Sequence, residues 1–275
     1  MQIAHDAPAP EVVVDEQDQA APYFVTAVER GMAVLQAFTA ARPELNFTEA
    51  GELTGLSRAT TRRLMLTLRD LGFLTSEDAR TFRLAPKVLQ LGYSYLSSMP
   101  LRDIARPHLE TLSGRLGETA GLAVLDGAEI LYVAIAMCPR LTAVRINLGT
   151  RFPAPATAAG RVLLANLPPA ALDKALAETT LDRAAGTTSE RVFRDRLAEI
   201  RDQGWALADS ELDDELRGAA APVADQDGRV TAAVSVSLHS GRQTAEAMQH
   251  EVIPQVRNTA DLIHADLTGT PRTRP

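Results

Sequence analysis

The stretch LTGLSRATTRRLMLTLRDLGFL, residues 53–74, decides the fold of the N-terminal part of the chain. Gly55 is suited to end a helix, and Ser57 is suited to cap the helix that follows. A helix, a tight glycine turn and a second helix stand in the order of a helix-turn-helix motif. GFLTSEDARTFRL, residues 72–84, adds two strand-like runs around a polar turn and predicts a β-wing.

The helix after Ser57 has two different sides. At 100° per residue, four side chains fall within about 80° and predict the core stripe: Thr60, Leu64, Leu68 and Leu71. Three arginines fall within about 40° on the opposite side, with a fourth beside them: Arg58, Arg62 and Arg69, flanked by Arg63. Arginine binds phosphate and, in bidentate fashion, guanine. A solvated helix face is the alternative, but no acidic partner lies at i+4 within the stripe, so DNA binding is favoured.

Composition bounds the rest of the protein. The chain has 275 residues, enough for two domains, and a net charge of −7. Residues 1–22 hold five acidic side chains and no lysine or arginine, which predicts a disordered acidic tail. No signal peptide or membrane-length apolar run is present, and a lone cysteine, Cys138, fits a reducing compartment. We therefore expect a cytoplasmic protein that does not bind membranes.

Helical and strand-like patterns predict five segments: an acidic tail over 1–22, a DNA-binding domain over 23–85, a linker helix over 86–100, a second domain over 101–268 and a tail over 269–275. The first helix places apolar residues at helical spacing: Val25, Val28, Met32, Leu35 and Phe38. Thr48 is the N-cap candidate for the short helix that precedes Gly55.

The second domain mixes helices and strands. A hairpin is predicted around Asp126-Gly127 and another around Asp227-Gly228, and LTAVRINLG, residues 141–149, predicts a further strand. A helix is expected to begin after Thr157, and a long amphipathic helix spans about 243–267. The predicted fold class is α+β, an antiparallel sheet with helices packed on it. Such folds often hold a small ligand.

Four ordered motifs resemble the IclR-type bacterial transcription regulators: residues 53–74, 82–96, 152–165 and 204–237. The resemblance covers almost the whole chain after Phe24. It implies a winged helix-turn-helix, a linker helix and a GAF-like effector-binding domain, assembled as a homodimer or tetramer. GWALADSEL, residues 204–212, and LGYSYLSS, residues 91–98, look most like the branch that regulates aromatic-acid catabolism. The implied effector is a small organic acid.

The resemblance and the helix pattern together predict which residues bind the partners. Operator DNA is expected to contact Ser57, Arg58, Thr60, Thr61, Arg62, Arg63 and Arg69, with Arg80 and Arg83 on the wing. The effector is expected to contact the backbone amides of Ala158, Ala159 and Gly160 at a helix start, and the side chains of Arg145, Asp209, Glu211, Ser235 and Ser237. RNA polymerase is a further expected partner. The family commonly has glycine at Glu215 and cysteine or serine at Gly218, so this loop departs from the pattern.

Several of these residues have other interpretations. Asp209 and Glu211 can line a pocket, form an ion pair with Arg217, or act as an acid–base pair. Arg145 can bind a carboxylate or pair structurally, and the two serines can face a pocket or solvent. The histidines lack metal-ligand spacing, and no phosphate-binding or nucleophile motif is present, so no cofactor, metal or enzymatic activity is expected. An architectural DNA-binding protein, a metabolite-acting enzyme fused to a DNA-binding domain, and a regulator of glyoxylate or sugar-acid metabolism are the alternatives.

Overall fold

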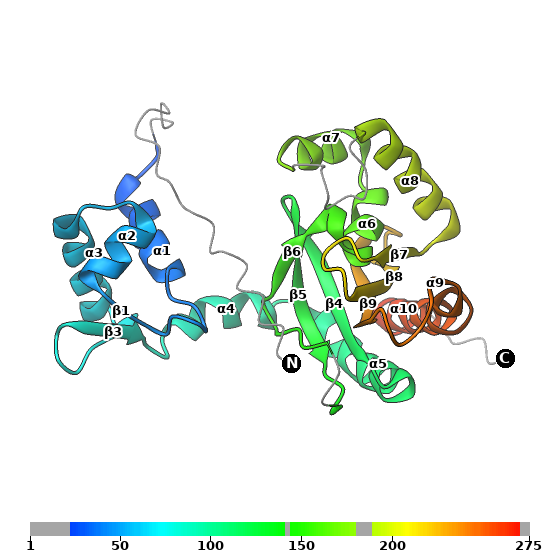
Figure 1. Ribbon diagram of the computed structural model, residues 1–275, viewed down its shortest axis with the longest axis horizontal. Helices are drawn as coiled ribbons and strands as arrows, with labels where there is room; N and C mark the ends of the chain where they lie inside the picture. Colours follow the sequence, from blue (N-terminus) through cyan, green and yellow to red (C-terminus); the bar gives the residue numbers. More distant parts are fainter. Residues whose placement is uncertain (1–22, 141–143, 180–188, 270–275) are drawn as a thin grey trace. The chain divides into compact units, whose positions relative to one another are not determined.

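The computed structural model describes residues 23–140, 144–179 and 189–269 (Figure 1). These residues divide into two compact units that meet in the sequence between Ser98 and Met99. The predicted acidic tail, residues 1–22, lies outside the described residues, as do residues 270–275 of the predicted C-terminal tail.

The unit that ends at Ser98 is a winged helix-turn-helix, which confirms the prediction. Its helices are α1 (Thr26–Gln36), α2 (Phe47–Thr54), α3 (Arg58–Asp70) and α4 (Val88–Ser97). Its small antiparallel sheet has the order β1-β3-β2 and comprises β1 (Glu44–Asn46), β2 (Leu74–Thr75) and β3 (Thr81–Leu84). Strands β2 and β3 form the wing. Phe82 is fully buried in the core, together with Val34, Leu45, Met65, Leu68 and Leu74, and the partly buried Phe47 packs on it with ring centroids 5.0 Å apart.

The caps of the helix-turn-helix are set by short-range hydrogen bonds. Asn46, rather than Thr48, is the N-cap of α2, because its side chain accepts from the Thr48 and Glu49 N–H groups. Glu49 completes a capping box by accepting from the Asn46 N–H at 2.9 Å. Gly55 ends α2 with φ of 68°, and Ser57 caps α3, as predicted.

The buried side of α3 is rotated slightly around the helix axis relative to the predicted stripe, and Leu68 belongs to both. Thr61, Met65 and Leu68 are buried, whereas Leu71 is 52% exposed and Thr60 is only half-buried. The spacing i, i+4, i+7 makes this stripe pack against α1 and α2. Thr61 was predicted to contact DNA, but it is fully buried and its hydroxyl donates to the Ser57 carbonyl at 3.1 Å. Thr61 is therefore a core residue.

The apolar stripe of α1 divides along its length. Leu35 and Phe38 are buried in the core, as their spacing predicted. Val25, Val28 and Met32 are exposed, Val28 by 62% of its surface. The helical spacing was correct, but the N-terminal half of the stripe does not face the core of its own chain.

The second unit is built on a six-stranded antiparallel sheet of order β6-β5-β4-β9-β8-β7. The strands are β4 (Thr119–Asp126), β5 (Glu129–Ala136), β6 (Arg151–Pro153), β7 (Ala206–Asp209), β8 (Leu216–Ala224) and β9 (Val230–His239). The two predicted hairpin turns are present, with left-handed Gly127 and Gly228. This α+β arrangement of helices on an antiparallel sheet matches the predicted fold class.

Helices cover both faces of this sheet (Figure 1). On one face lie α5 (Pro100–Leu116) and α10 (Ile253–Thr268), which also pack against each other. On the other face lies α6 (Ala158–Ala165), preceded by the single turn η1 (Ala154–Ala156) and covered by α8 (Glu190–Gln203), with α7 (Pro169–Ala177) beside it. We call the second face the α6 face.

Two predicted elements differ in the structure. Residues 144–149 form no strand, and residues 141–143 lie outside the described part of the chain. The Val144 carbonyl accepts a hydrogen bond from the Thr119 hydroxyl at 2.6 Å, so a side chain takes the place of a strand partner. The predicted C-terminal helix is divided into α9 (Ala245–Ala247), the π-helical segment η3 (Met248–Val252) and α10. Pro254 lacks an N–H group, which breaks the i to i−4 hydrogen-bond pattern there.

Among the helices in the described ranges, none combines the length and the apolar character that crossing a membrane requires.

Candidate functional site

The exposed side of α3 carries a cluster of guanidinium groups. Arg58, Arg62 and Arg63 are exposed, and no ion pair is found for any of them within the described residues. The Arg62 guanidinium carbon lies 6.0 Å from the centroid of the Phe47 ring, a cation–π distance that leaves its N–H groups free to meet another partner. Arg69 differs, because its guanidinium binds the neighbouring Asp70 carboxylate at 2.8 Å. Three unpaired arginines on one helix form a surface suited to phosphate and base edges.

The wing places its two predicted arginines differently. Arg80 is exposed beside the turn, whereas Arg83 forms an ion pair with Glu44 across β1 and β3. The turn is held by the Asp78 carboxylate, which accepts from the Arg80 and Thr81 N–H groups, each at 2.8 Å. These hydrogen bonds hold the pKa of Asp78 below its ordinary value. Within the part of the chain that the structure describes, the wing thus offers one arginine without an ion pair, Arg80, and one that is already partly neutralised, Arg83.

The α6 face of the larger sheet gathers residues from four strands. Thr119 lies opposite Ser237, and Gly121 lies opposite Ser235. Residues directly opposite each other in an antiparallel pair point to the same face. Gly218 pairs with Ser237, and a Cβ built on Gly218 would meet the Ala158 Cβ at 3.7 Å. The sheet therefore places the predicted serines beneath the start of α6.

Sequence reasoning missed Tyr132, a buried residue of β5 on this face. Its hydroxyl lies 3.2 Å from the Ser235 hydroxyl. Its ring occupies the space above Gly121, where an added Cβ would lie 2.7 Å from the ring. Burial raises the pKa of Tyr132, so its hydroxyl stays protonated at neutral pH. Its strand letters, EILYVAIA, contain one aromatic residue among aliphatic ones, which was the available signal.

Residues at the start of α6 have roles in capping and packing in addition to the predicted contact with an effector. Thr157 caps the helix by accepting from the Gly160 N–H at 3.0 Å, so that amide is not available to an effector. A Cβ at Gly160 would lie 2.1 Å from the Ala154 carbonyl oxygen, which explains the glycine. Ala158 and Ala159 are buried, and their amides at the first helical positions remain the predicted anion cradle.

The two predicted carboxylates both have ion-pair partners. Asp209 accepts from the Arg217 guanidinium at 2.7 Å, as one of the alternative interpretations stated. Glu211 accepts at 2.8 Å from Arg161, whose side chain is almost completely buried and whose Nε donates to the Pro155 carbonyl. Burial lowers the pKa of Arg161, and the charge of Glu211 opposes that effect. These contacts fix the loop after β7 against α6.

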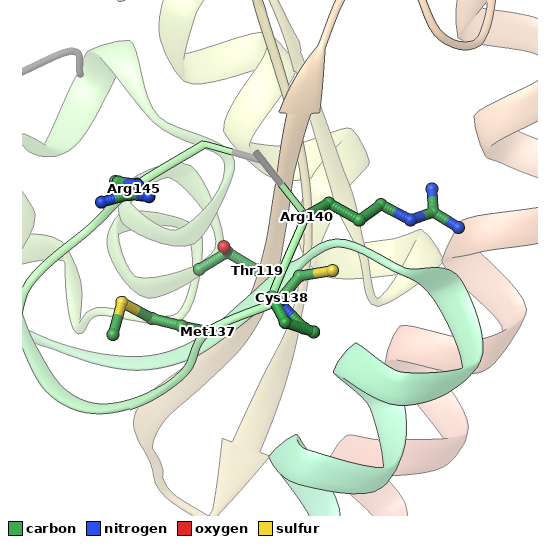
Figure 2. Close-up of a pocket in the computed structure, with 6 residues that line it drawn as sticks. Thr119, Met137, Cys138, Arg140 and Arg145 are labelled. Atoms are coloured by element: carbon green, nitrogen blue, oxygen red, sulfur yellow. The ribbon is translucent and has the colours of Figure 1, made fainter. Parts of the chain in front are cut away.

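A pocket of about 340 Å³ opens at the start of β4 and just after the end of β5. Its walls are formed by Thr119, Met137, Cys138, Pro139, Arg140 and Arg145. Figure 2 shows the Arg140 and Arg145 side chains extending to opposite sides, with Met137 on the side of Arg145 and Thr119 between the two arginines. Arg145 is exposed, and of the predicted effector residues it is the one that lines this pocket. Thr119 connects the pocket to the α6 face, because it lies opposite Ser237.

In the described residues, no group of three or more histidine, cysteine or acidic side chains is arranged to hold a metal ion. A cationic helix in a winged helix-turn-helix and a pocket in a second domain define a DNA-binding protein with a ligand-binding domain.

Comparison with known proteins identifies the family. Residues 27–78 match the IclR helix-turn-helix domain, and residues 93–265 match the C-terminal domain of the bacterial transcriptional regulator IclR. The chain belongs to the IclR family of bacterial transcriptional regulators.

Three similar proteins illustrate the relationship. The chain is 40% identical over 248 residues to the Pca regulon regulatory protein of Pseudomonas putida, covering 88% of this chain and 84% of that protein. It is 32% identical over 245 residues to the p-hydroxybenzoate hydroxylase transcriptional activator of Acinetobacter baylyi, covering 86% and 90%. The solved inducer-binding domain of a double mutant of PobR from Acinetobacter, in complex with 3-hydroxybenzoic acid, is 28% identical, with a TM-score of 0.56 and coverage of 60% and 98%.

Proposed function

We propose that this regulator controls genes of aromatic-acid catabolism in the cytoplasm, binding operator DNA as a homodimer and responding to a hydroxylated aromatic carboxylate. The observation that carries the DNA part is the unpaired arginine surface of α3, Arg58, Arg62 and Arg63. Helix α3 would enter a major groove while the wing arginine Arg80 meets phosphate. Two such helices in a dimer fit a pseudo-palindrome with half-sites about one or more helical turns apart.

The operator is found by selecting bound fragments from a random double-stranded DNA library with the full-length protein. A two-fold-related motif is the expected result. Binding of the selected duplex should weaken steeply with salt, because arginine contacts release phosphate counterions. Equal binding of the selected and scrambled duplexes would contradict operator recognition and favour an architectural DNA-binding protein.

Exposed apolar side chains support the homodimer. Val25, the N-cap residue of α1, and Val28 within the helix are exposed by 59% and 62%. Helix α4 has no buried residue and exposes four large apolar side chains: Leu89, Leu91, Tyr93 and Tyr95. Exposed apolar patches of this kind mark protein interfaces. Light scattering coupled to size-exclusion chromatography should give the mass of two or four chains. The Val28→Asp variant should have a lower mass.

The proposal that the effector is an aromatic carboxylate is based on the pocket at Arg145 and on the hydroxyl groups of the adjoining sheet face. A guanidinium at the rim can bind a carboxylate, and the Thr119 side chain lies at the end of the sheet face that carries Tyr132 and Ser235. An aromatic acid is supported by the relatives named as the Pca regulon regulatory protein and the p-hydroxybenzoate hydroxylase transcriptional activator, and by the 3-hydroxybenzoic acid complex of the PobR double mutant. RNA polymerase is the expected partner at the promoter.

A thermal-shift titration tests the effector class. Protocatechuate and 4-hydroxybenzoate should raise the melting temperature, since a ligand at 100 times its dissociation constant adds about 2.7 kcal/mol. Arg145→Gln should remove the shift without changing operator affinity, and Arg115→Gln, a loss of one exposed arginine outside the pocket, is the matched control. A shift with glyoxylate or a sugar acid, and none with aromatic acids, would leave the assignment as a regulator unchanged. It would assign the protein to a different metabolic pathway.

A further inference from the structure

A second groove lies beside the Arg145 pocket in the same unit. It has a volume of about 240 Å³ and lies between α5 and the segment that follows β5. Its polar side chains are Arg102, Arg106 and Asn147. The rest of its lining is apolar: Ala134, Ile135, Met137, Ile146 and Leu148. A groove with guanidinium groups and an apolar wall has the chemistry of a site for an amphipathic anion.

The charge in this groove is positive. Arg102 and Arg106 are one helical turn apart on α5, so both project from the same side of the helix. Arg102 is half-buried, and no ion pair is found for it in the described residues. Arg106 approaches Glu110 at 3.6 Å, a pair in which both side chains are more than 60% exposed. No residue that lines the groove is acidic, so nothing within it neutralises Arg102.

The groove and the Arg145 pocket share a wall. Met137 lines both of them, and Arg145 lines the pocket while its neighbours Ile146 and Asn147 line the groove. This wall is tied to the sheet at both ends. The Val144 carbonyl accepts from Thr119, and the Tyr132 N–H donates to the Thr150 carbonyl at 3.0 Å. A ligand in one cavity therefore contacts residues that also shape the other.

We propose that this groove is a second ligand site that takes a monocarboxylate with a planar or branched apolar body. The carboxylate would bind Arg102 and Arg106, and the apolar body would lie against Ile135 and Ile146. Charge-assisted hydrogen bonds to two guanidinium groups, with apolar contacts beside them, are the recognition chemistry. The inference adds a site to the proposed function, and it depends on that function only for the choice of an aromatic acid as probe.

The position of Arg102 gives this site a regulatory consequence. Arg102 lies in the first turn of α5, close in sequence to the boundary between the two units at Ser98 and Met99. An anion that orders Arg102 acts on the first turn of the helix that follows the linker. The same anion contacts Met137 in the wall of the Arg145 pocket. Occupancy of the groove should therefore change affinity at the Arg145 pocket, and the coupling should be reciprocal.

Equilibrium dialysis of the full-length protein against radiolabelled 4-hydroxybenzoate tests the proposal. The expected stoichiometry is two molecules per chain. Arg102→Gln should weaken one class of site by about tenfold or more and leave the other class measurable. The exposed-residue variant Arg106→Gln should act on the same class, which keeps the test valid if Arg102→Gln fails to fold. Arg115→Gln, which removes a charge from the last turn of α5, should retain both classes.

The outcomes separate this proposal from the proposed function. One molecule per chain, abolished by Arg145→Gln and unaffected by Arg102→Gln, would overturn the second site and leave the effector site standing. No saturable binding at all would overturn both for aromatic acids. If Arg102→Gln changed the oligomeric mass but not the stoichiometry, the groove would be an interface between chains, and the proposal would be wrong. The supporting result is two classes of site in the wild type, one of which is lost in Arg102→Gln and the other in Arg145→Gln.

Discussion

Three arginines of α3 and two arginines of the second unit, Arg161 and Arg217, are used in opposite ways. On α3, Arg58, Arg62 and Arg63 are exposed, with no ion-pair partner in the described part of the chain. In the second unit, Arg161 is 1% exposed and binds Glu211, and Arg217 binds Asp209. An unpaired surface guanidinium keeps its donors for an external anion, whereas a buried one must be matched inside the protein. The difference separates a binding surface from a structural support.

The comparison predicts its largest effect at the buried pair. Glu211→Ala leaves the Arg161 guanidinium buried without its carboxylate, and one Arg161 nitrogen already has no hydrogen-bond partner among the described residues. Breaking a buried pair from one side costs about 3–5 kcal/mol. Urea denaturation should show that loss in the free energy of unfolding. Asp209→Ala, which unpairs the less buried Arg217, should cost less, and an equal cost would show that burial does not distinguish the two pairs.

The next effect concerns the exposed arginines. Arg62→Ala should weaken operator binding by about 1–3 kcal/mol, because it removes a contact to DNA without removing an internal pair. Fluorescence anisotropy with the selected duplex measures the loss, and effector binding should be unchanged. Arg191→Ala is the control, since Arg191 is an exposed arginine of α8 in the other unit, and its 3.8 Å pair with Asp195 is exposed as well. Operator affinity equal to that of wild type in Arg62→Ala would remove this stripe from the DNA-binding surface.

A smaller effect is expected inside the α6 face. Tyr132→Phe removes one hydroxyl and leaves the Ser235 hydroxyl without that partner, a cost of about 1 kcal/mol in stability. If the hydroxyl pair contacts the effector, affinity for 4-hydroxybenzoate should fall while affinity for benzoate is retained. Calorimetric titration of both acids gives the ratio. Equal losses for both acids would assign Tyr132 to packing alone.

The smallest effect is expected at the wing turn. The backbone hydrogen bonds to Asp78 lower its folded-state pKa, so its contribution to stability is present above the unfolded value of 3.8. That contribution is lost as pH falls through the lowered pKa. The melting temperature of Asp78→Ala should therefore lie below that of wild type at pH 7, and the gap should close under acid conditions. A gap that widened as pH fell would contradict the assigned hydrogen bonds.

Sequence patterns predicted the parts that depend on neighbours in the chain. Gly55 and Ser57 were assigned correctly because helix caps are decided within a few residues. The turns at Asp126-Gly127 and Asp227-Gly228 were correct for the same reason. Thr48 was wrong because Asn46 is equally local and the better cap, with Glu49 completing the box. The start of α2 could therefore be predicted from the sequence, but Thr48 was not the residue best suited to cap it.

Tertiary contacts account for the other differences. The stripe Thr61, Met65 and Leu68 is set by how α3 packs on α1 and α2, which the helical period alone leaves free by one residue. Residues 144–149 are not a strand, because a threonine from β4 takes the Val144 carbonyl. The candidate effector residues Asp209 and Glu211 turned out to be ion-paired. Asp209 pairs with Arg217 because β7 and β8 are neighbours in the sheet, and Glu211 pairs with Arg161 because α6 packs against β7.

The sequence by itself determined the family motifs, the helix-turn-helix, the cationic side of α3 and the α+β class, because these depend on periodicity, caps and turns that act over a few residues. Only the tertiary structure decided which polar residues meet. Tyr132 and Ser235 are 103 positions apart, and Arg161 and Glu211 are 50 positions apart. The Arg145 pocket and the adjoining Arg102 groove depend on packing between distant segments. Local hydrogen bonding fixes the elements, whereas burial and long-range pairing place their side chains.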